Sequence, residues 1–247
     1  GKQYLIRLVF QATKKKKTIG TTPTLTIERL DLNGCGVAKL NNKPVFIEQT
    51  LAGERIKCKI VEEKSKYLRG KIISIDLASN KRIPPLCEHY RLCGGCDLQH
   101  YDYEEHLRFK QHKVSTLFQR NDIKQTLPWQ EAVVGEAWYY RRKARIGVQY
   151  DKQGQVTLGF RQRATNQLVA IKKCQVLEHG IDDIFTPLKN VIKGLSLSRS
   201  IGHVEVIKTD QTTLVIRQLK KLNQQDIAHW LEASKVQQWQ ILFDDSE

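Results

Sequence analysis

The clearest pattern in the chain is a strict alternation of apolar and basic residues over positions 55–60. Successive side chains of a β-strand point to opposite faces, so Ile56, Cys58 and Ile60 would share one face and the basic side chains the other. Further apolar stretches, separated by turns that contain Asn or Gly, lie at 25–30, 45–47 and 67–77. Five short strands within residues 23–80 predict a small closed barrel of the oligonucleotide-binding kind.

The last strand of this barrel is expected to place Ile73 and Ile75 on its apolar face. A helix is then predicted within residues 98–120. Asp102 and Glu105 have the spacing of a capping box, with Asp in place of the usual Ser or Thr. Apolar residues recur behind them at helical spacing, at Leu107, Val114, Leu117 and Phe118. The helix therefore has an apolar stripe that can pack on another element.

Alternation returns in residues 138–174, which are predicted to form a meander of strands. Its third strand, Leu168 to Cys174, would carry a cysteine. Beyond it we expect a helix near 179–194, a hairpin over 203–219, a helix near 223–233 and a strand over 239–243. The predicted fold class is β-rich α+β, with a five-stranded barrel at 23–80 followed by a mixed α+β domain at 81–247.

A large excess of positive charge limits the choice of partner. Forty-one Lys and Arg residues against 26 Asp and Glu give the 247-residue chain a net charge of +15. Such an excess favours nucleic acid or an anionic membrane surface. No stretch is long and apolar enough to span a bilayer, and the first residues lack the pattern of a signal peptide. We therefore expect a cytoplasmic protein that binds RNA or DNA and no membrane.

The positive charge is concentrated in two regions. Residues 1–80 contain 16 Lys and Arg against 7 Asp and Glu, and residues 135–173 contain 9 against 2. In the second region Tyr139 and Tyr140 adjoin the basic residues, and nucleobases stack on aromatic rings while phosphates pair with cations. The candidate RNA-binding residues are Lys57, Lys59, Lys66, Arg69, Lys71, Arg141, Arg142, Lys143 and Arg145. The alternative is that both regions are ordinary charged faces in contact with water.

Residues 1–22 are basic and have no regular hydrophobic pattern. We expect a solvated tail, whose four consecutive lysines at 14–17 can add phosphate contacts without sequence preference. The chain begins with Gly and contains no Met, which favours a processed or partial product.

Four of the six cysteines have the spacing of a metal site. Cys87, Cys93 and Cys96 lie within ten residues, with two glycines between the last pair, and Cys174 follows far downstream. Clustered thiolates are soft metal ligands, and three clustered thiols with one distant thiol are typical of a [4Fe–4S] site. Zinc held by the four thiolates, or with His89 or His100 replacing one of them, is the alternative.

The other two cysteines show no sign of catalysis. Cys58 belongs to the alternating strand and is expected to be a small core residue. Cys35 lies in a turn with no activating base beside it. Three disulfides are disfavoured, because the chain is long, has no export signal and clusters its cysteines.

Taken together, these features support a family resemblance. A basic barrel, Cys87 to Cys96, the Trp138–Arg145 stretch and Cys174 occur in that order. The chain resembles the RumA/RlmD type of 23S ribosomal RNA uracil-C5 methyltransferase over nearly all of residues 23–247. The resemblance implies that the barrel is a TRAM domain, an RNA-binding module. It also implies that the four cysteines hold a [4Fe–4S] cluster in a central domain.

The resemblance further implies the reaction. In that family a cysteine thiolate attacks C6 of a flipped-out uracil, C5 takes a methyl group from S-adenosylmethionine, and a base removes the C5 proton. The cofactor would lie in a doubly wound α/β domain. This chain departs from the family there, because it has no glycine-rich strand–turn–helix unit, no Asp-x-Phe-Cys-Gly-like motif and no late nucleophilic cysteine.

We therefore expect the chain to be the N-terminal, RNA-recognising part of such an enzyme, with no catalytic or S-adenosylmethionine-binding residue of its own. Its partner would be 23S ribosomal RNA, and it would be a monomer. The helix at 98–120 would pack on the missing catalytic domain and leave its apolar stripe partly exposed here. The alternatives are a metal-stabilised RNA-binding module without an enzymatic parent and a related transfer RNA uracil-C5 methyltransferase.

Overall fold

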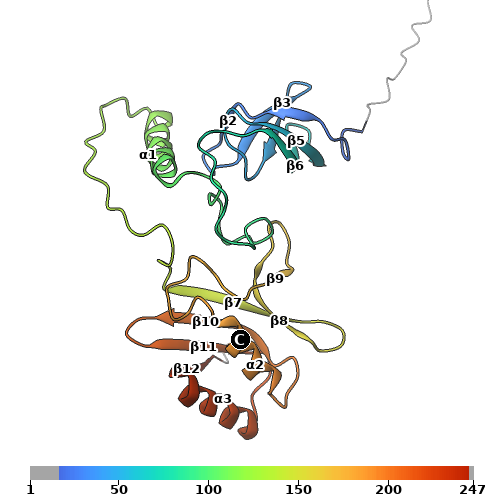
Figure 1. The fold of residues 1–247 in the computed structure, drawn as a ribbon, viewed down its shortest axis with the longest axis vertical. Coiled ribbons are helices and arrows are strands. Elements are labelled where there is room, and N and C mark those ends of the chain that lie inside the picture. The colour runs from blue at the N-terminus through green and yellow to red at the C-terminus, as the bar shows by residue number, and fades with distance from the viewer. Residues whose placement is uncertain (1–16, 245–247) are drawn as a thin grey trace, which may run out of the picture. The chain divides into compact units, whose positions relative to one another are not determined.

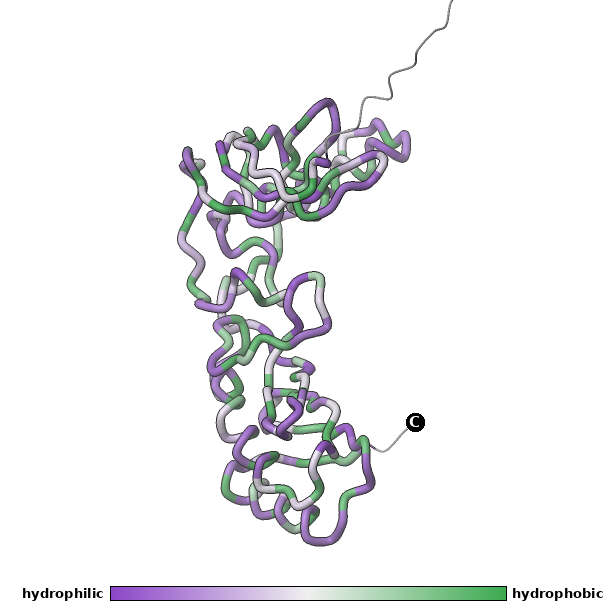
Figure 2. The backbone as a smooth tube through the Cα atoms, turned by 90° about the vertical axis from the view of Figure 1, so that its right-hand side faces the viewer, coloured by the Kyte–Doolittle hydropathy of each residue, from purple (hydrophilic) through white to green (hydrophobic). Residues whose placement is uncertain are grey.

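The computed structural model describes residues 17–244, which form two compact units. The first unit ends at Arg82 and the second begins at Ile83 (Figure 1). Hydrophobic and hydrophilic residues alternate along the chain in both units (Figure 2), as a structure with half-buried strands requires. Within the described residues, no helix is long and apolar enough to cross a membrane.

The first unit is one six-stranded sheet with the order β1-β5-β6-β4-β3-β2. Its strands are β1 (Thr24–Thr26), β2 (Arg29–Leu30), β3 (Gly36–Leu40), β4 (Lys43–Ile47), β5 (Arg55–Glu63) and β6 (Leu68–Leu77). β4 and β6 pair in parallel, and the other neighbours are antiparallel. The predicted alternation in β5 is confirmed, because Ile56, Cys58 and Ile60 are fully buried in the core.

The sheet has six strands rather than the predicted five, because residues 24–30 form two short strands that pair with different neighbours. β1 pairs with β5, whereas β2 pairs with β3. Between them, the N–H of Ile27 donates to the carbonyl of Glu54, and that of Glu28 donates to the carbonyl of Val37. One continuous segment therefore bonds to both edges of the sheet, which closes it into the predicted barrel.

The prediction that Ile73 lies on the apolar face of β6 is wrong, because the pairing of this strand shifts in register. Ile73 is 47% exposed, whereas Ile72 and Ile75 pack against the barrel core. The partners of Lys57 and Cys58 are Ser74 and Ile72, so the pairing skips Ile73. A bulge of this kind inserts one extra residue and turns the side chains before it to the other face. The strict alternation assumed for the sequence therefore fails at this point.

The end of the predicted tail belongs to the barrel. Residues 1–16, including most of the lysine run, lie outside the described residues. The N–H of Gly20 donates to the carbonyl of Ile60, and the N–H of Ile60 donates to the carbonyl of Thr21, at 2.8 and 3.0 Å. Residues 20–22 are therefore not a free tail, because they extend the pairing of β5.

The second unit contains another six-stranded sheet, with the order β12-β11-β10-β7-β8-β9. Its strands are β7 (Lys143–Tyr150), β8 (Val156–Arg161), β9 (Leu168–Ala170), β10 (Ile201–Lys208), β11 (Thr212–Gln218) and β12 (Trp239–Asp244). Only β11 and β12 pair in parallel. The helices α2 (Phe185–Lys193) and α3 (Gln224–Gln237) pack on this sheet through Phe185, Leu188 and Trp230, all at most 1% exposed.

Two predicted boundaries in this unit are wrong for the same reason. β9 ends at Ala170, so Cys174 lies in the loop that follows the strand and not on it. The helix predicted near 179–194 begins only at Phe185. The N–H of Cys174 donates to the carbonyl of Asp182 at 2.8 Å. Residues 174–182 therefore form a loop closed by this hydrogen bond, and they belong to neither β9 nor α2.

The helix α1 (Tyr103–Arg120) starts later than residue 98 because Asp102 caps it. Oδ1 of Asp102 accepts from the backbone N–H groups of Glu104 and Glu105 at 3.1 and 3.3 Å, which satisfies donors that the first turn leaves free. No residue of α1 is buried. The apolar stripe remains exposed, at 39–41% for Val114, Leu117 and Phe118.

Candidate metal centre and nucleic-acid interface

The three clustered cysteines lie in the loop between β6 and α1, and this loop bonds to the end of β8. Cys93 forms an isolated β-bridge with Gln162. The N–H of Gly94 donates to the carbonyl of Arg161 at 2.9 Å, and that of Arg163 donates to the carbonyl of Leu92 at 3.0 Å. A Cβ at Gly94 would lie 3.1 Å from the Arg161 carbonyl oxygen. Glycine therefore permits the close approach that holds Cys93 in place.

All four cysteines of the predicted metal site influence one another. Burial raises the pKa of the Cys87 thiol, and the neighbouring Cys174, Cys93 and Cys96 raise it further. Burial also raises the pKa of Cys174, with a contribution from Cys96. The distant thiol and the clustered thiols therefore act on one another electrostatically, while the metal site itself stays a prediction.

Backbone N–H groups point at three of these sulfurs. The N–H of Gly95 donates to Sγ of Cys93 at 3.4 Å. Backbone hydrogen bonds from His89 to Cys87, and from Val176 and Leu177 to Cys174, lower the pKa of the thiols that receive them. Such donors favour the thiolate, which is the form that binds metal.

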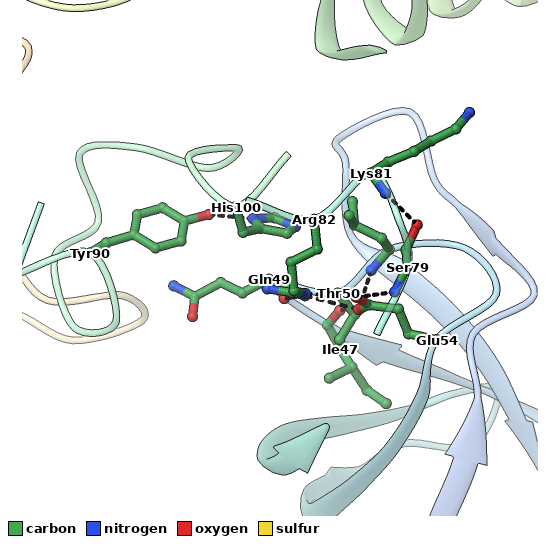
Figure 3. Close-up of polar contacts among 10 residues, drawn as sticks. Ile47, Gln49, Thr50, Glu54, Ser79, Lys81, Arg82, Tyr90 and His100 are labelled. Atoms are coloured by element: carbon green, nitrogen blue, oxygen red, sulfur yellow. Dashed lines mark hydrogen bonds and ion pairs between the residues drawn. The ribbon is translucent and has the colours of Figure 1, made fainter. Parts of the chain in front are cut away.

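A metal centre at these cysteines stays a prediction. Within residues 17–244, no three or more His, Cys, Asp or Glu side chains are arranged as ligands of one metal ion. His100, one of the two alternative ligands, is fully buried, and its Nδ1 lies 2.7 Å from Oη of Tyr90 (Figure 3). His89 lies 3.3 Å from the carboxylate of Glu88.

Arg163, which sequence reasoning missed, connects the cysteine loop to the hairpin of β8 and β9. Its Nη1 pairs with Asp97 at 3.0 Å, and Nη2 donates to the carbonyl of Cys96. Its guanidinium also lies over the ring of Tyr90, 5.5 Å from the centroid. The Arg163 side chain is mostly buried, whereas that of Asp97 is 71% exposed, so the ion pair is open to water on the Asp97 side. No sequence motif marked this residue, because its partners come from another segment.

A buried ion pair fixes the C-terminal end of the first unit. Glu54 is fully buried and accepts from Nε and Nη2 of Arg82 at 2.6 and 2.8 Å (Figure 3). Backbone N–H groups of Leu51 and Ser79 donate to the same carboxylate. Burial alone would raise the pKa of Glu54, but these hydrogen bonds hold it below its ordinary value. The pair anchors residues 79–82 to the barrel.

The predicted RNA-binding residues of the barrel lie on the outer face of β5 and β6. Lys57, Lys59 and Lys71 are exposed, and Lys59 stands directly opposite Lys71. Like charges in that position repel each other, which an anion would relieve. Within the described residues, no carboxylate pairs with these three lysines or with the exposed Lys66.

Arg69 differs from these lysines because it already has partners. Its Nε lies 3.2 Å from Glu62, and its guanidinium lies over the ring of Tyr67, 5.4 Å from the centroid. Tyr67 also meets Phe46 edge to face, with centroids 5.8 Å apart. Arg69 can therefore contact an RNA phosphate only if its guanidinium leaves the Glu62 carboxylate or contacts both groups at once.

The predicted RNA-binding residues of the second unit are exposed but paired. Lys143 and Arg145 on β7 both contact Glu205 on β10, at 3.4 and 2.8 Å. Arg142 pairs with Glu178 at 2.8 Å. Side-chain exposures of 64–70% for the three cations place them in solvent, where such pairs contribute only about 0–1 kcal/mol. They can therefore exchange a carboxylate for a phosphate.

Arg141 is placed differently from its neighbours. Its backbone N–H donates to the carbonyl of Val176, and its carbonyl accepts from Glu178. This short bridge pairs Arg141 with Leu177, whose N–H donates to the carbonyl of Cys174 at 3.3 Å. The guanidinium lies over the ring of Tyr140, 6.0 Å from the centroid. Sequence reasoning found this stretch by its aromatic and basic composition but missed its connection to the loop that carries the fourth thiol.

The remaining cysteines lie in the barrel. Cys58 is fully buried in its core, as predicted. Burial raises the pKa of Cys35 to about 12, and the carboxylates of Asp31 and Glu48 contribute to the increase. At neutral pH the Cys35 thiol stays protonated, which is the opposite of what a nucleophile or a metal ligand requires.

Comparisons with known proteins agree on one family. Residues 16–73 match the TRAM domain. The 23S rRNA (uracil(1939)-C(5))-methyltransferase RlmD of Colwellia psychrerythraea is 45% identical, with 96% of this chain and 55% of the relative covered. The RlmD of Vibrio campbellii is 35% identical, with 92% of this chain and 52% of the relative covered. The chain spans about half the length of the curated relatives that it matches.

A solved structure supports the fold. The tRNA (uracil-54, C5)-methyltransferase of Pyrococcus abyssi, in complex with S-adenosyl-L-homocysteine, has a TM-score of 0.61. The match covers 83% of this chain and 48% of that one, at 18% sequence identity. Identity this low bears on the fold alone, whereas the relatives above share sequence over nearly the whole chain. The chain therefore belongs to the RlmD-type family of 23S rRNA uracil-C5 methyltransferases.

Proposed function

We propose that this chain is the RNA-recognising part of an S-adenosylmethionine-dependent 23S rRNA uracil-C5 methyltransferase that forms 5-methyluridine. The observation that carries the proposal is its identity of 45% over 96% of the chain to an RlmD enzyme. The TRAM domain and the exposed lysines of β5 and β6 support RNA as the partner. Ribosomal RNA as substrate implies action in the cytoplasm, and we propose that the chain acts as a monomer.

We further propose that the chain binds RNA but does not transfer a methyl group by itself. Within residues 17–244, both sheets are mainly antiparallel. A doubly wound parallel sheet, as dinucleotide-like cofactors commonly use, is not found in that part of the chain. We assign no catalytic and no S-adenosylmethionine-binding residue to it.

We propose that Cys87, Cys93, Cys96 and Cys174 hold a [4Fe–4S] cluster. Each cysteine of such a cluster binds a different iron, so the sulfurs stand farther apart than around one zinc. The spacing of three clustered cysteines and one distant cysteine supports this proposal. The N–H donors to three sulfurs fit bound thiolates. The cluster would cross-link the loop before α1 to the loop after β9.

We propose a domain division that follows the sequence boundaries. A TRAM barrel predicted at 23–80, to which residues 20–22 and Arg82 are also bonded, is followed by an iron–sulfur domain predicted at 81–247. The helix predicted at 98–120, observed as α1, would pack on a catalytic domain. Its exposed apolar stripe supports this proposal. Exposed apolar side chains at helical spacing are a common feature of surfaces that meet another domain.

The test of RNA recognition measures binding and methyl transfer on the same protein. A labelled 23S rRNA fragment containing the target uridine is titrated with the chain, and the affinity is measured between low and high salt. We expect binding that weakens steeply with salt, because neutralised phosphates release counterions, and no methyl transfer from labelled S-adenosylmethionine. Affinity that does not change with salt would contradict the proposal that charge drives RNA binding. Methyl transfer by the chain alone would contradict the proposal that it binds RNA without catalysing the reaction.

Two alternatives have their own readouts. A transfer RNA substrate is suggested by the solved structure with this fold, and tighter binding to transfer RNA than to the 23S fragment would favour it. A zinc-stabilised module without catalysis is distinguished by anaerobic purification and metal analysis. A brown protein with about four irons per chain is expected for the cluster, whereas a colourless protein with one zinc would favour the alternative.

A further inference from the structure

Two rings from different segments form a stacked pair beside the loop that carries Cys174. The centroids of Tyr139 and His179 are 3.9 Å apart, and their planes meet at 22°. The ammonium group of Lys173 lies over the Tyr139 ring, 5.9 Å from its centroid. The His179 side chain is 72% exposed. The two rings therefore form a short column with Lys173 beside it, and the column ends in an imidazole that is open to solvent.

The column is held in place from both sides. The N–H of Tyr139 donates to the carbonyl of Gln175 at 3.0 Å, and the tyrosine hydroxyl donates to Oε1 of the same residue. On the other side, Nδ1 of His179 lies 3.7 Å from the buried carboxylate of Asp182, which also accepts from the N–H of Gly180. Because Asp182 bonds to Cys174 through its carbonyl, the proposed metal loop supports the column.

The backbone at Tyr139 is strained. Its φ is +54°, a conformation that costs a residue with a side chain about 1–3 kcal/mol and that glycine adopts freely. Tyrosine occupies this position although glycine would adopt the same backbone conformation without strain. Strain of this kind is common where a side chain is held in place for a ligand.

The charges around the column suit a nucleic acid. Arg142, 70% exposed, pairs with Glu178, which directly precedes His179 in the chain, and Lys173, 50% exposed, pairs with Asp182. Arg142 is mostly exposed, so its pair with Glu178 is weak and it can turn to a phosphate, whereas Lys173 stays beside the buried carboxylate of Asp182. A ring face beside mobile cations is the combination that binds unpaired nucleotides.

We infer that the exposed face of His179 is a stacking site for one unpaired nucleobase of the RNA, with Arg142 beside it for a phosphate. The inference rests on the proposed function and adds a site to it, since no sequence motif includes His179. Stacking is tolerant of base identity because every base has a π-face. The site therefore positions the RNA strand and does not select the uridine.

The test compares His179→Ala with His179→Phe. Base stacking on a ring contributes about 1–3 kcal/mol, so loss of the ring is expected to weaken binding of the labelled 23S fragment by roughly tenfold. His179→Phe keeps a ring and is expected to bind within about twofold of the original chain. The salt dependence should be the same in both variants, because neither Ala nor Phe carries a charge that could release a counterion. His112→Ala, at an exposed histidine of α1, is the control and should bind normally.

A second variant separates stacking from folding. Tyr139→Gly removes the supporting ring at a position whose φ suits glycine, so the thermal stability should fall little while RNA affinity falls. An abasic scan of the RNA should find one position whose loss matches that of His179→Ala and is not additive with it.

The possible results have distinct meanings. If the original chain binds no RNA, the proposed function fails. If it binds RNA and His179→Ala binds equally well, the stacking site is wrong while the function stands. If His179→Phe is as weak as His179→Ala but His179→Lys binds normally, the residue acts through charge, and the stacking inference is overturned.

Discussion

At the scale of single residues, buried polar groups hold parts of the chain together through hydrogen bonds and ion pairs. Glu54 is the clearest case, since a fully buried carboxylate is tolerated only when it is hydrogen-bonded and paired. Arg82 supplies two donors, and two backbone N–H groups supply the others. The pair joins the last residues of the first unit to a turn of its barrel.

Replacing Arg82 should therefore destabilise the first unit. Arg82→Ala leaves the Glu54 carboxylate buried without a counter-charge, and losing one partner of a buried pair costs about 3–5 kcal/mol. Urea or thermal unfolding measures this loss. Arg55→Ala, at an exposed arginine one residue from Glu54, is the matched control and should change the stability by less than about 0.5 kcal/mol.

The same pair predicts the pH dependence of stability. The pKa of Glu54 is lower in the folded chain than in the unfolded one. Its contribution is therefore present above the ordinary carboxyl pKa and is lost as the pH falls through the depressed value. The difference in stability between the original chain and Glu54→Gln should shrink on acidification. A difference that stays constant from neutral pH into the acid range would contradict this account.

A cysteine variant tests the proposed metal ligands. Cys174→Ser should lose most of the bound iron and the visible absorption, because one iron of the cluster then lacks its thiolate. Cys35→Ser should keep both, since that thiol lies in the barrel and has a pKa of about 12. Iron per chain after anaerobic purification is the measurement. Full iron content in Cys174→Ser would remove this residue from the ligand set.

At the scale of secondary-structure elements, cross-strand contacts decide how basic the surface is. Glu205 on β10 faces two cations of β7, Lys143 and Arg145. The hydrogen bond from Arg145 is the main reason why the pKa of Glu205 lies below its ordinary value, and Lys143 adds to the effect. The carboxylate thus stays ionised and partly neutralises the basic strand, which the count of charges in residues 135–173 could not show.

Removing this carboxylate should strengthen RNA binding. Glu205→Gln frees both cations for phosphates, so we expect an affinity about two- to fivefold higher at low salt and a steeper salt dependence. Glu232→Gln, at an exposed position on α3, removes the same charge elsewhere and is the control. Conversely, charge reversal of Arg142 and Lys143 should weaken binding. Equal affinities for Glu205→Gln and the control would show that β7 does not contact RNA.

The helix α1 makes a separate prediction. None of its residues is buried, so Leu117→Ser should change the stability of this chain by less than about 0.5 kcal/mol. Leu188→Ala on α2, which empties a fully buried position, should cost about 2–5 kcal/mol. Thermal unfolding compares the two. A large loss in Leu117→Ser would mean that the apolar stripe belongs to the core of this chain and is not a surface for another domain.

At the scale of the whole chain, two units carry different parts of the proposed function. The first unit presents lysines that no described carboxylate neutralises. The second unit contains the four cysteines of the proposed metal site, the Tyr139–His179 column and the cations of β7. If the cysteine loop is a structural cross-link, removing the metal should disturb RNA binding through this second surface more than through the barrel lysines.

The sequence by itself determined the features that depend on local order along the chain. Alternation placed Ile56, Cys58 and Ile60 in the barrel core because the side-chain period of a strand is two. Asp102 predicted the start of α1 because a cap bonds to N–H groups two and three residues ahead. The cysteine spacing and the Trp138–Arg145 stretch identified the family, because they are fixed patterns within short segments.

Tertiary structure decided what depends on partners distant in the sequence. The bulge at Ile73 arises from pairing between β5 and β6, and the loop that carries Cys174 is held by Asp182 rather than by a strand. Arg163 reaches Cys96 and Asp97 across the β8 bridge. His179 meets Tyr139 only because the chain folds back between them. Residues so far apart meet through packing and hydrogen bonds that no local pattern encodes, which is why the sequence alone did not reveal this column.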